Sequence, residues 1–340
     1  MHDLWYNFLA IGVDDVKKIE LLAPAGDKQA FIGAINAGAD AVYLSGKLFG
    51  ARKYANNFTK EEIRDLVKYA HMRNVKVFVT INTLIFEHEI ESLFSYADDL
   101  VSSNVDALIV QDLGVLHQFV KRYPDTEIHA STQMNAYNKE QVAYLKNSGV
   151  RRVVLARETS IQTIKEIKQH VDIDLEVFVH GALCVSYSGN CLFSSLNGGR
   201  SGNRGACAQP CRLSYDLIED DNRVVKDTYL LSTKDLMTLD SLKDIIDSGV
   251  SSLKIEGRMK RSKYVIATVR AYREAVDHIL EGKAFDIDKR LNELLSVFNR
   301  AYTKGYILNE QPYNITNLFR PNHLGIESGE VLDIKNGKTT

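Results

Sequence analysis

The sequence predicts a (β/α)₈ barrel of the TIM type, in which eight parallel strands form a closed ring covered by helices. Strand-like and helix-like segments alternate from residue 19 onward, and eight strand-like segments fall within residues 19–281. A barrel of this kind typically needs about 250 residues. The strand-like segments are short and rich in Val, Ile and Leu, as expected for parallel strands buried on both faces.

The strand-like segments recur along the whole of this region. They are residues 19–23, 40–45, 75–80, 107–110, 127–131, 152–156, 175–179 and 252–255. A doubly wound open sheet is the alternative fold, but it would not need eight such units. The segment Pro24-Ala25-Gly26 after the first strand is also not a glycine-rich nucleotide loop.

The helices are indicated by caps and by apolar spacing. Asp27 is expected to cap a helix over Lys28–Ala39, and Tyr264–Leu280 is expected to follow the last strand. A helix after the third strand is predicted by apolar residues at helical spacing, namely Ile90, Leu93, Phe94 and Ala97.

Two stretches interrupt this pattern. Residues 182–250, between strands seven and eight, are longer than one helix requires and form a cysteine-rich insertion within the barrel. Residues 282–340 are expected to form an extension, with a helix over Ile287–Phe298 and the start of a truncated C-terminal β module over Gly325–Asp333. Residues 1–18 are expected to be an N-terminal extension.

The composition is ordinary for a soluble globular protein, at 45% apolar and 25% charged residues. The formal net charge of −2 shows no global bias toward nucleic acid or membrane, although a local basic patch remains compatible with it. No apolar run approaches the roughly 20 residues that span a bilayer, and the first residues do not resemble a secretory signal. We expect a cytoplasmic protein without a membrane partner.

All four cysteines are clustered, in the order C-x₆-C-x₁₅-C-x₃-C, at Cys184, Cys191, Cys207 and Cys211. In a reducing compartment, clustered thiols are more often metal ligands than disulfides. Four thiolates suit a tetrahedral zinc ion or a [4Fe–4S] cluster, and the wide first spacing favours the cluster. Free buried thiols are the remaining alternative. Gly181, Gly189 and Gly205 are expected to let the backbone approach the cluster.

Polar residues at the carboxyl ends of the strands are the candidate site, because this end of a barrel forms the active face. The predicted substrate-binding residues are Arg52, Asn82, Gln111, Gln133, Arg157, Arg204 and Lys260. The predicted catalytic residues are Glu176, His180, Glu256 and Arg258. The alternative for about half of these strand-end residues is that they only cap strands.

A basic region is expected to meet the cysteine-rich insertion. Lys254–Lys263 holds five cations and one acid, and Arg200, Arg204 and Arg212 lie close to the cysteines. Gly257 is expected to let the chain turn sharply, so that Arg258 points across the mouth of the barrel. Such a patch suits phosphate or carboxylate. A solvated helix start is the alternative for Lys260, Arg261 and Lys263. No RNA-recognition signature with interleaved aromatic residues is present.

Several motifs together resemble the collagenase-like U32 peptidase family. They are Glu20–Gly26 (ELLAPAG), Glu176–Cys184 (EVFVHGALC), Gly189–Ser194 (GNCLFS), Arg204–Arg212 (RGACAQPCR) and Lys254–Arg258 (KIEGR). The resemblance covers residues 19 to about 330 and implies a barrel core, often followed by a small C-terminal β domain. The family was named for a reported collagenase activity.

Other members of this family are oxygen-independent hydroxylases that carry a [4Fe–4S] cluster. Some act at carbon 5 of a pyrimidine in tRNA or rRNA, with prephenate implicated, and others act in ubiquinone biosynthesis. The motif match implies that Cys184, Cys191, Cys207 and Cys211 are the cluster ligands.

The favoured hypothesis is therefore an iron–sulfur-dependent RNA hydroxylase. Its expected partners are tRNA or rRNA and a carboxylate co-substrate such as prephenate, with a reductant or a companion subunit as a further candidate. The alternative is a peptidase hydrolase, in which Cys184 near His180 would be the nucleophile. The sequence has no H-E-x-x-H zinc site and no G-x-S-x-G elbow. A third hypothesis is a structural metal site in an RNA-binding protein.

Overall fold

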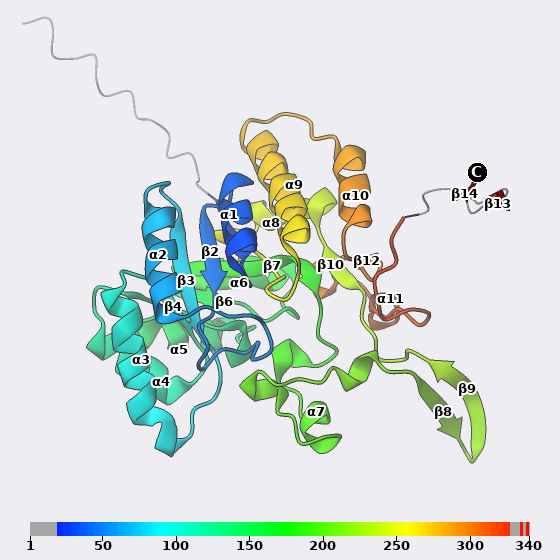
Figure 1. Ribbon diagram of the computed structural model, residues 1–340, viewed down its shortest axis with the longest axis horizontal. Coiled ribbons are helices and arrows are strands. Elements are labelled where there is room, and N and C mark those ends of the chain that lie inside the picture. The colour runs from blue at the N-terminus through cyan, green and yellow to red at the C-terminus, as the bar shows by residue number, and fades with distance from the viewer. Residues whose placement is uncertain (1–18, 327–333, 336–337, 340) are drawn as a thin grey trace, which may run out of the picture.

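A computed structural model describes residues 19–326, 334–335 and 338–339, and its central element is a closed barrel of eight parallel strands (Figure 1). The ring closes because the last strand pairs with both the first and the seventh, with Ser252 opposite Glu20 on one side and opposite Glu176 on the other. The barrel strands are β1 (Glu20–Pro24), β2 (Ala41–Leu44), β3 (Lys76–Ile81), β4 (Ala107–Val110), β5 (Glu127–Ala130), β6 (Arg152–Val154), β7 (Asp174–Ala182) and β11 (Ser252–Ile255). This confirms the predicted fold class.

Helices surround the ring and bury their apolar faces against it. Several begin at the side-chain caps that the sequence offers: the Asp27 carboxylate accepts from the backbone N–H of Ala30, and Thr59 forms a capping box with Glu62. The surrounding helices are α1 (Lys28–Asn36), α2 (Lys60–His71), α3 (Ile90–Ser102), α4 (Leu113–Arg122), α5 (Lys139–Asn147), α6 (Ile161–His170), α8 (Leu242–Asp247) and α9 (Ser262–Leu280).

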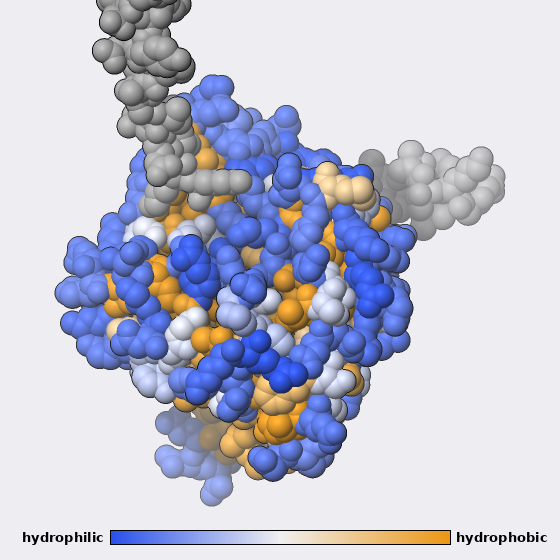
Figure 2. Space-filling view, turned by 90° about the vertical axis from the view of Figure 1, so that its left-hand side faces the viewer, coloured by the Kyte–Doolittle hydropathy of each residue, from blue (hydrophilic) through white to orange (hydrophobic). Residues whose placement is uncertain are grey.

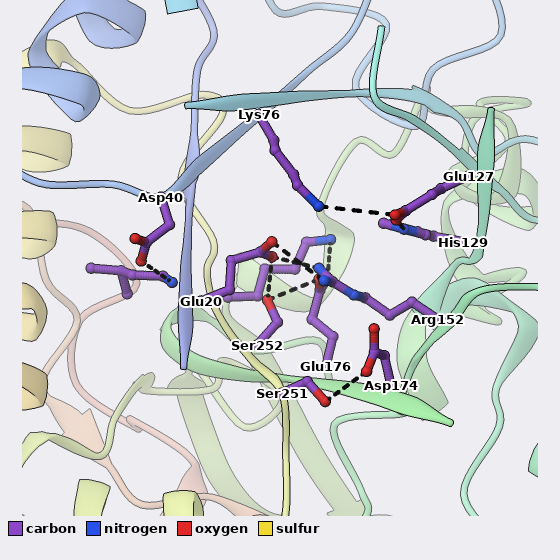
Figure 3. A network of polar contacts seen from close by, with 12 residues as sticks. Glu20, Asp40, Lys76, Glu127, His129, Arg152, Asp174, Glu176, Ser251 and Ser252 are labelled. Atoms are coloured by element: carbon purple, nitrogen blue, oxygen red, sulfur yellow. Dashed lines mark hydrogen bonds and ion pairs between the residues drawn. The ribbon is translucent and has the colours of Figure 1, made fainter. Parts of the chain in front are cut away.

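The barrel interior has an apolar layer and a charged layer. Alternate residues of each strand point inward, and Leu22, Tyr43, Phe78 and Ile109 belong to a buried cluster that is separate from the main core between strands and helices. Other strand residues are polar or charged and meet in one network (Figure 3). On β1 and β3 these are Glu20 and Lys76, two residues before Leu22 and Phe78, and on β5, β6, β7 and β11 they are Glu127, Arg152, Glu176, Ser252 and Lys254.

The expected insertion contains more regular structure than the sequence indicated. Strand β7 runs on to Ala182, and its end pairs with the antiparallel strand β10 (Asp235–Met237), which in turn pairs with β12 (Tyr302–Thr303) from the C-terminal extension. The insertion also holds the short helix α7 (Phe193–Leu196) and a hairpin, β8 (Tyr215–Glu219) with β9 (Asn222–Thr228), which projects away from the barrel (Figure 1).

The C-terminal extension begins with a helix that is two residues shorter than predicted, α10 (Ile287–Ser296), and continues through α11 (Pro312–Ile315). The backbone pairs once more in β13 (Ile334–Lys335) with β14 (Lys338–Thr339). The expected N-terminal extension, residues 1–18, and most of the expected β segment up to Asp333 lie outside the described residues. None of the helices in the described ranges is long and apolar enough to cross a membrane.

Candidate active site

A cavity of about 620 Å³ lies at the carboxyl ends of the barrel strands and is covered by the cysteine loop, defined here as residues 183–214. The loop is held down by contacts with three barrel loops. The backbone N–H of Lys53 donates to Gly205 O at 3.0 Å, Arg204 binds Glu89, and the Ser188 hydroxyl donates to Glu158 at 2.8 Å. The loop therefore folds over the barrel mouth, as the sequence predicted.

Gly205 is needed where the loop meets the barrel. Its φ is +79°, and a Cβ there would stand 2.5 Å from the carbonyl oxygen of Gly50. Only glycine tolerates both this conformation and this approach. Gly181 and Gly189 also have positive φ, so all three predicted glycines occupy backbone positions that favour glycine.

All four cysteines line this cavity. Burial raises the pKa of the Cys211 thiol, and the charges of Cys184, Cys207 and Cys191 act in the same direction, while Arg212 opposes them. Two backbone N–H groups point at sulfur: Phe193 N lies 3.4 Å from Cys191 Sγ, and Gln209 N lies 3.3 Å from Cys207 Sγ. Such N–H groups stabilise thiolates and tune iron–sulfur clusters.

Within the described ranges, no group of three or more His, Cys, Asp or Glu side chains is placed so that it could hold a metal ion. A tetrahedral zinc ion with Zn–S bonds of about 2.3 Å draws its four thiolates close together, whereas a four-iron cluster bonds each thiolate through a different iron. Four cysteines facing one cavity, two of them with N–H donors at sulfur, have the right donor chemistry for such a cluster.

The cavity carries an excess of positive charge. Glu256 is the one carboxylate that lines it among the described residues. Glu256 lies 3.3 Å from Arg52 and 3.9 Å from Arg157, and the hydroxyl of Tyr43 donates to it. Burial would raise the pKa of Glu256, but the neighbouring arginines outweigh burial and lower it. Eight cationic side chains share the wall: Arg52, Arg157, Arg200, Arg212, Lys254, Arg258, Lys260 and Arg300.

Arg258 is the buried cation without a carboxylate partner. It is 5% exposed, and its guanidinium donates to Thr80 Oγ1 at 3.1 Å and makes no ion pair with any described residue. Burial, followed by repulsion from Arg52, lowers the pKa of Arg258 to about 10. An anion in the cavity would supply the missing charge, and an arginine fork matches a carboxylate or a phosphate.

Arg258 points into the mouth as predicted, but the reason for Gly257 differs from the prediction. The φ of Gly257 is not in the left-handed region, so no sharp turn requires it. Instead, a Cβ at Gly257 would stand 2.8 Å from the Tyr264 ring and 3.1 Å from Pro24. Gly26 of the first-strand motif is closer still, since its Cβ would stand 1.9 Å from the carbonyl oxygen of Arg258. Both glycines therefore let the segment after β1 and the segment after β11 approach each other closely.

Lys260 differs from its neighbours Arg261 and Lys263. It lies over the ring of Phe298 inside the cavity wall, and burial followed by Arg300 lowers its pKa to about 7. Arg261 and Lys263 are exposed, as expected for a solvated helix start.

Beneath the cavity, a charged network fills the barrel floor (Figure 3). Lys254 lines the cavity and lies 2.7 Å from Glu176, which is fully buried. Glu176 also binds Arg152 at 3.1 Å, and Arg152 reaches Glu20 on the far side. Burial would raise the pKa of Glu176, but Lys254 and Arg152 outweigh it and lower this pKa to about 2.

The structure therefore brings most of the predicted residues together. Those that line the cavity are the four cysteines with Arg52, Asn82, Gln133, Arg157, Glu256, Arg258 and Lys260. Gln111 is buried outside its lining, Arg204 lines a neighbouring groove, and Glu176 reaches the cavity only through Lys254.

His180 also lies outside the cavity lining. Its ring is buried between Tyr264, Tyr272 and Tyr302, with centroid distances of 5.5–5.8 Å. This burial lowers the pKa of His180 to about 3. Its Nε2 has no hydrogen-bond partner among the described residues, so it makes no hydrogen bond to the Cys184 thiol. His180 is therefore not positioned as a base that activates Cys184.

Two cavity residues, Tyr43 and Arg300, were not predicted from the sequence, and Lys254 was predicted only as part of the basic region Lys254–Lys263. Lys254 carried a signal, because a lysine within a short apolar strand must be paired. The sequence gives no such signal for Tyr43, which resembles a core residue of a strand, or for Arg300, which lies in the C-terminal extension.

A family model described as Peptidase family U32 matches residues 26–317. The chain belongs to this family. A U32 relative from Escherichia coli strain K12, named 23S rRNA 5-hydroxycytidine C2501 synthase, is 40% identical over 93% of this chain and 49% of its own length. A relative from Bacillus subtilis strain 168, named tRNA hydroxylation protein P1, is 40% identical over 84% of this chain and 69% of its own length.

The U32 relatives also include a protein named collagenase from Porphyromonas gingivalis, which is 33% identical over 87% of this chain and 75% of its own length. The chain thus spans about half the length of the E. coli relative. The matched region contains the barrel strands from β2 to β11 and the cysteine loop, and it begins just after β1.

Proposed function

We propose that this U32 member supports oxygen-independent hydroxylation of a pyrimidine base in tRNA or rRNA. The observation that carries the proposal is that four cysteines and eight cationic side chains, with one carboxylate, line a single cavity at the mouth of the barrel. Its volume lies within the range of about 300–1,000 Å³ that small-molecule sites occupy. The names of the relatives at 40% identity, an rRNA hydroxycytidine synthase and a tRNA hydroxylation protein, support this substrate class.

Cys184, Cys191, Cys207 and Cys211 would hold a [4Fe–4S] cluster in the roof of the cavity. When bound, such a cluster supplies electron transfer next to the substrate. The N–H groups of Phe193 and Gln209 would stabilise the charge on its thiolate ligands.

The chain's own residues would hold the anionic partner of the reaction. Arg258 has no carboxylate partner, so its guanidinium is free to bind a carboxylate co-substrate such as prephenate. Arg52 and Arg157 flank it and are tied to Glu256, which keeps their side chains in place. A carboxylate held there would lie between the barrel floor and the cysteines.

A base that is stacked within RNA must leave its stack to enter a pocket at the mouth of the barrel. The amide of Gln133 and the side chain of Asn82 line the wall, and Gln133 Oε1 has no hydrogen-bond partner among the described residues. These groups could read the edge of a pyrimidine, while the covering loop limits the access of water.

The peptidase alternative receives less support. A cysteine nucleophile requires a base to activate it, and the histidine nearest to Cys184 in sequence is enclosed by three tyrosines. A single nucleophile would also leave three cysteines in the same cavity without a role.

Metal content, nucleoside mass spectrometry and gelatin cleavage together test the proposal. Protein purified without oxygen should contain about four irons per chain, and each single Cys→Ala variant should lose the cluster to a comparable degree. RNA from a strain lacking the gene should lack one hydroxylated pyrimidine by nucleoside mass spectrometry. Stoichiometric zinc without iron would contradict the cluster. The peptidase would be favoured by one pattern of gelatin cleavage. In that pattern, Cys184→Ala loses the activity, whereas Cys191→Ala, Cys207→Ala and Cys211→Ala keep it.

A further inference from the structure

A second hollow lies beside the active-site cavity, on the outer rim of the barrel mouth. It is a groove of about 330 Å³ between the loop that follows β2, the loop that follows β3 and the cysteine loop. Consecutive residues divide the two hollows, since Lys53 lines the groove and Tyr54 lines the cavity. The groove and the cavity therefore share one wall.

Two exposed aromatic rings stand on this rim, each with an arginine of the cysteine loop against its face. Tyr54 is 57% exposed, and the guanidinium carbon of Arg200 lies 4.6 Å from its ring centroid. Phe86 is 54% exposed and lies 4.2 Å from the guanidinium carbon of Arg204. His88 stacks on Phe86 with an interplanar angle of 16°.

The charge of the rim is positive. Lys47 and Lys53 line the groove, are exposed, and make no ion pair with any residue in the described ranges. Arg204 also lines the groove but is paired with Glu89 at 2.5 Å. Figure 2, which views the molecule from the side of α2 and α3, shows apolar surface beside strongly hydrophilic surface toward the end that the cysteine loop covers.

Exposed rings that carry arginines, next to unpaired lysines, are the elements with which proteins bind single-stranded nucleic acid. Bases stack on the rings, and the cations follow the phosphates. The three segments that supply these residues are far apart in sequence, which explains why the sequence shows no linear RNA-recognition motif.

We infer that this rim, made of Lys47, Lys53, Tyr54, Phe86, Arg200 and Arg204, binds the unpaired nucleotides that flank the base held in the cavity. The inference rests on the proposed function, because it takes RNA as the substrate. Tyr54 stacks on one flanking base, the exposed stack of His88 on Phe86 stacks on another, and Lys47 and Lys53 contact the backbone phosphates in the groove. The substrate is thus a loop or another single-stranded region, rather than a continuous duplex.

The test is fluorescence anisotropy of the full chain, purified without oxygen, with a labelled 12-nucleotide single-stranded RNA and with the same sequence as a blunt duplex. The single strand should bind more tightly. Tyr54→Ala and Phe86→Ala should each weaken its binding about tenfold, since stacking contributes about 1–3 kcal/mol per base. Tyr54→Phe should bind like wild type. Lys47→Ala and Lys53→Ala should each reduce the slope of log affinity against log salt by about 0.7.

Matched controls use residues away from the mouth. Tyr144 on α5 is 51% exposed, and Lys121 lies in the last turn of α4, so Tyr144→Ala and Lys121→Ala should bind like wild type. Unchanged unfolding midpoints and iron content would show that the rim variants are folded. Wild-type affinity in both Tyr54→Ala and Phe86→Ala, a preference for the duplex, or no binding of RNA by the wild type would each overturn the inference. Because binding is measured without turnover, a missing hydroxylation would leave this result standing and would count against the proposed function alone.

Discussion

Lys254 and Glu176 form a buried ion pair, with 2.7 Å between Nζ and Oε1, at the boundary between the barrel floor and the cavity. Lys254 is 4% exposed and contributes to the cavity wall, while Glu176 is fully buried below it. The aromatic faces of Tyr43 and Phe178 lie near the ammonium group. The charges of the floor network thus hold a cation in place at the cavity wall.

Glu176→Gln should strongly destabilise the protein. The change leaves Lys254 and Arg152 buried without their shared carboxylate, and breaking a buried pair from one side costs about 3–5 kcal/mol. Denaturant unfolding measures the loss, with Glu166→Gln on the exposed face of α6 as the matched control. If Glu176→Gln were as mild as Glu166→Gln, the network would not be a stabilising element.

Gly26→Ala should disrupt the mouth of the barrel. The added Cβ would stand 1.9 Å from the backbone oxygen of Arg258, which cannot move as a flexible side chain could. We expect a loss of about 1–3 kcal/mol or more in the free energy of unfolding. Gly114→Ala is the control, because its Cβ would meet only Asp112 Oδ1 at an ordinary 3.4 Å. Equal stability of the two variants would contradict the close approach.

Arg258→Lys should impair turnover, because lysine cannot reproduce the planar fork that binds a carboxylate or a phosphate. If Arg258 binds a carboxylate co-substrate, the variant should need more co-substrate and keep its RNA affinity. If it binds an RNA phosphate, affinity and its salt slope should both fall, the slope by about one unit. Lys263→Ala, which alters an exposed lysine on α9, is the control. If Arg258→Ala had the turnover, the co-substrate requirement and the RNA affinity of wild type, Arg258 would lie outside the active site.

His180 should make stability fall on mild acidification. Its pKa of about 3 in the folded protein lies below the ordinary value of 6.5. As pH falls below about 6.5, the unfolded chain gains a proton that the buried ring cannot accept, so the unfolded state is favoured. Between pH 7 and pH 5, wild type should lose roughly 2 kcal/mol more than His180→Gln. His170→Gln, at an exposed position, should follow wild type. Identical pH slopes for wild type and His180→Gln would contradict the buried neutral imidazole.

The sequence predicted the fold well because its signals are local. All eight strands were found from apolar segments, and the helix cap at Asp27 and the strand β11 at Ser252–Ile255 were placed correctly. The extension of β7 and its pairing with β10 were missed, since that pairing joins segments that are about 55 residues apart and lacks apolar alternation.

The site was predicted only in part, for a physical reason. Arg52, Arg157 and Arg258 follow strand ends, where the barrel rule places them at the mouth. His180 also follows this rule by position, yet the extended β7 carries it among three tyrosines and away from the cavity. Side-chain direction at an irregular strand end depends on tertiary pairing, which residue spacing does not reveal.

We propose that the cysteines and Arg258 act together in the hydroxylation of an RNA pyrimidine. The most direct test is nucleoside mass spectrometry of total tRNA and rRNA from a strain lacking the gene, complemented with wild type, Cys207→Ser, Arg258→Ala or the control Lys263→Ala. A pyrimidine with one additional oxygen should be absent without the gene and should return with wild type and Lys263→Ala. It should stay absent with Cys207→Ser and Arg258→Ala. An unchanged set of hydroxylated pyrimidines in the strain lacking the gene would contradict the proposal.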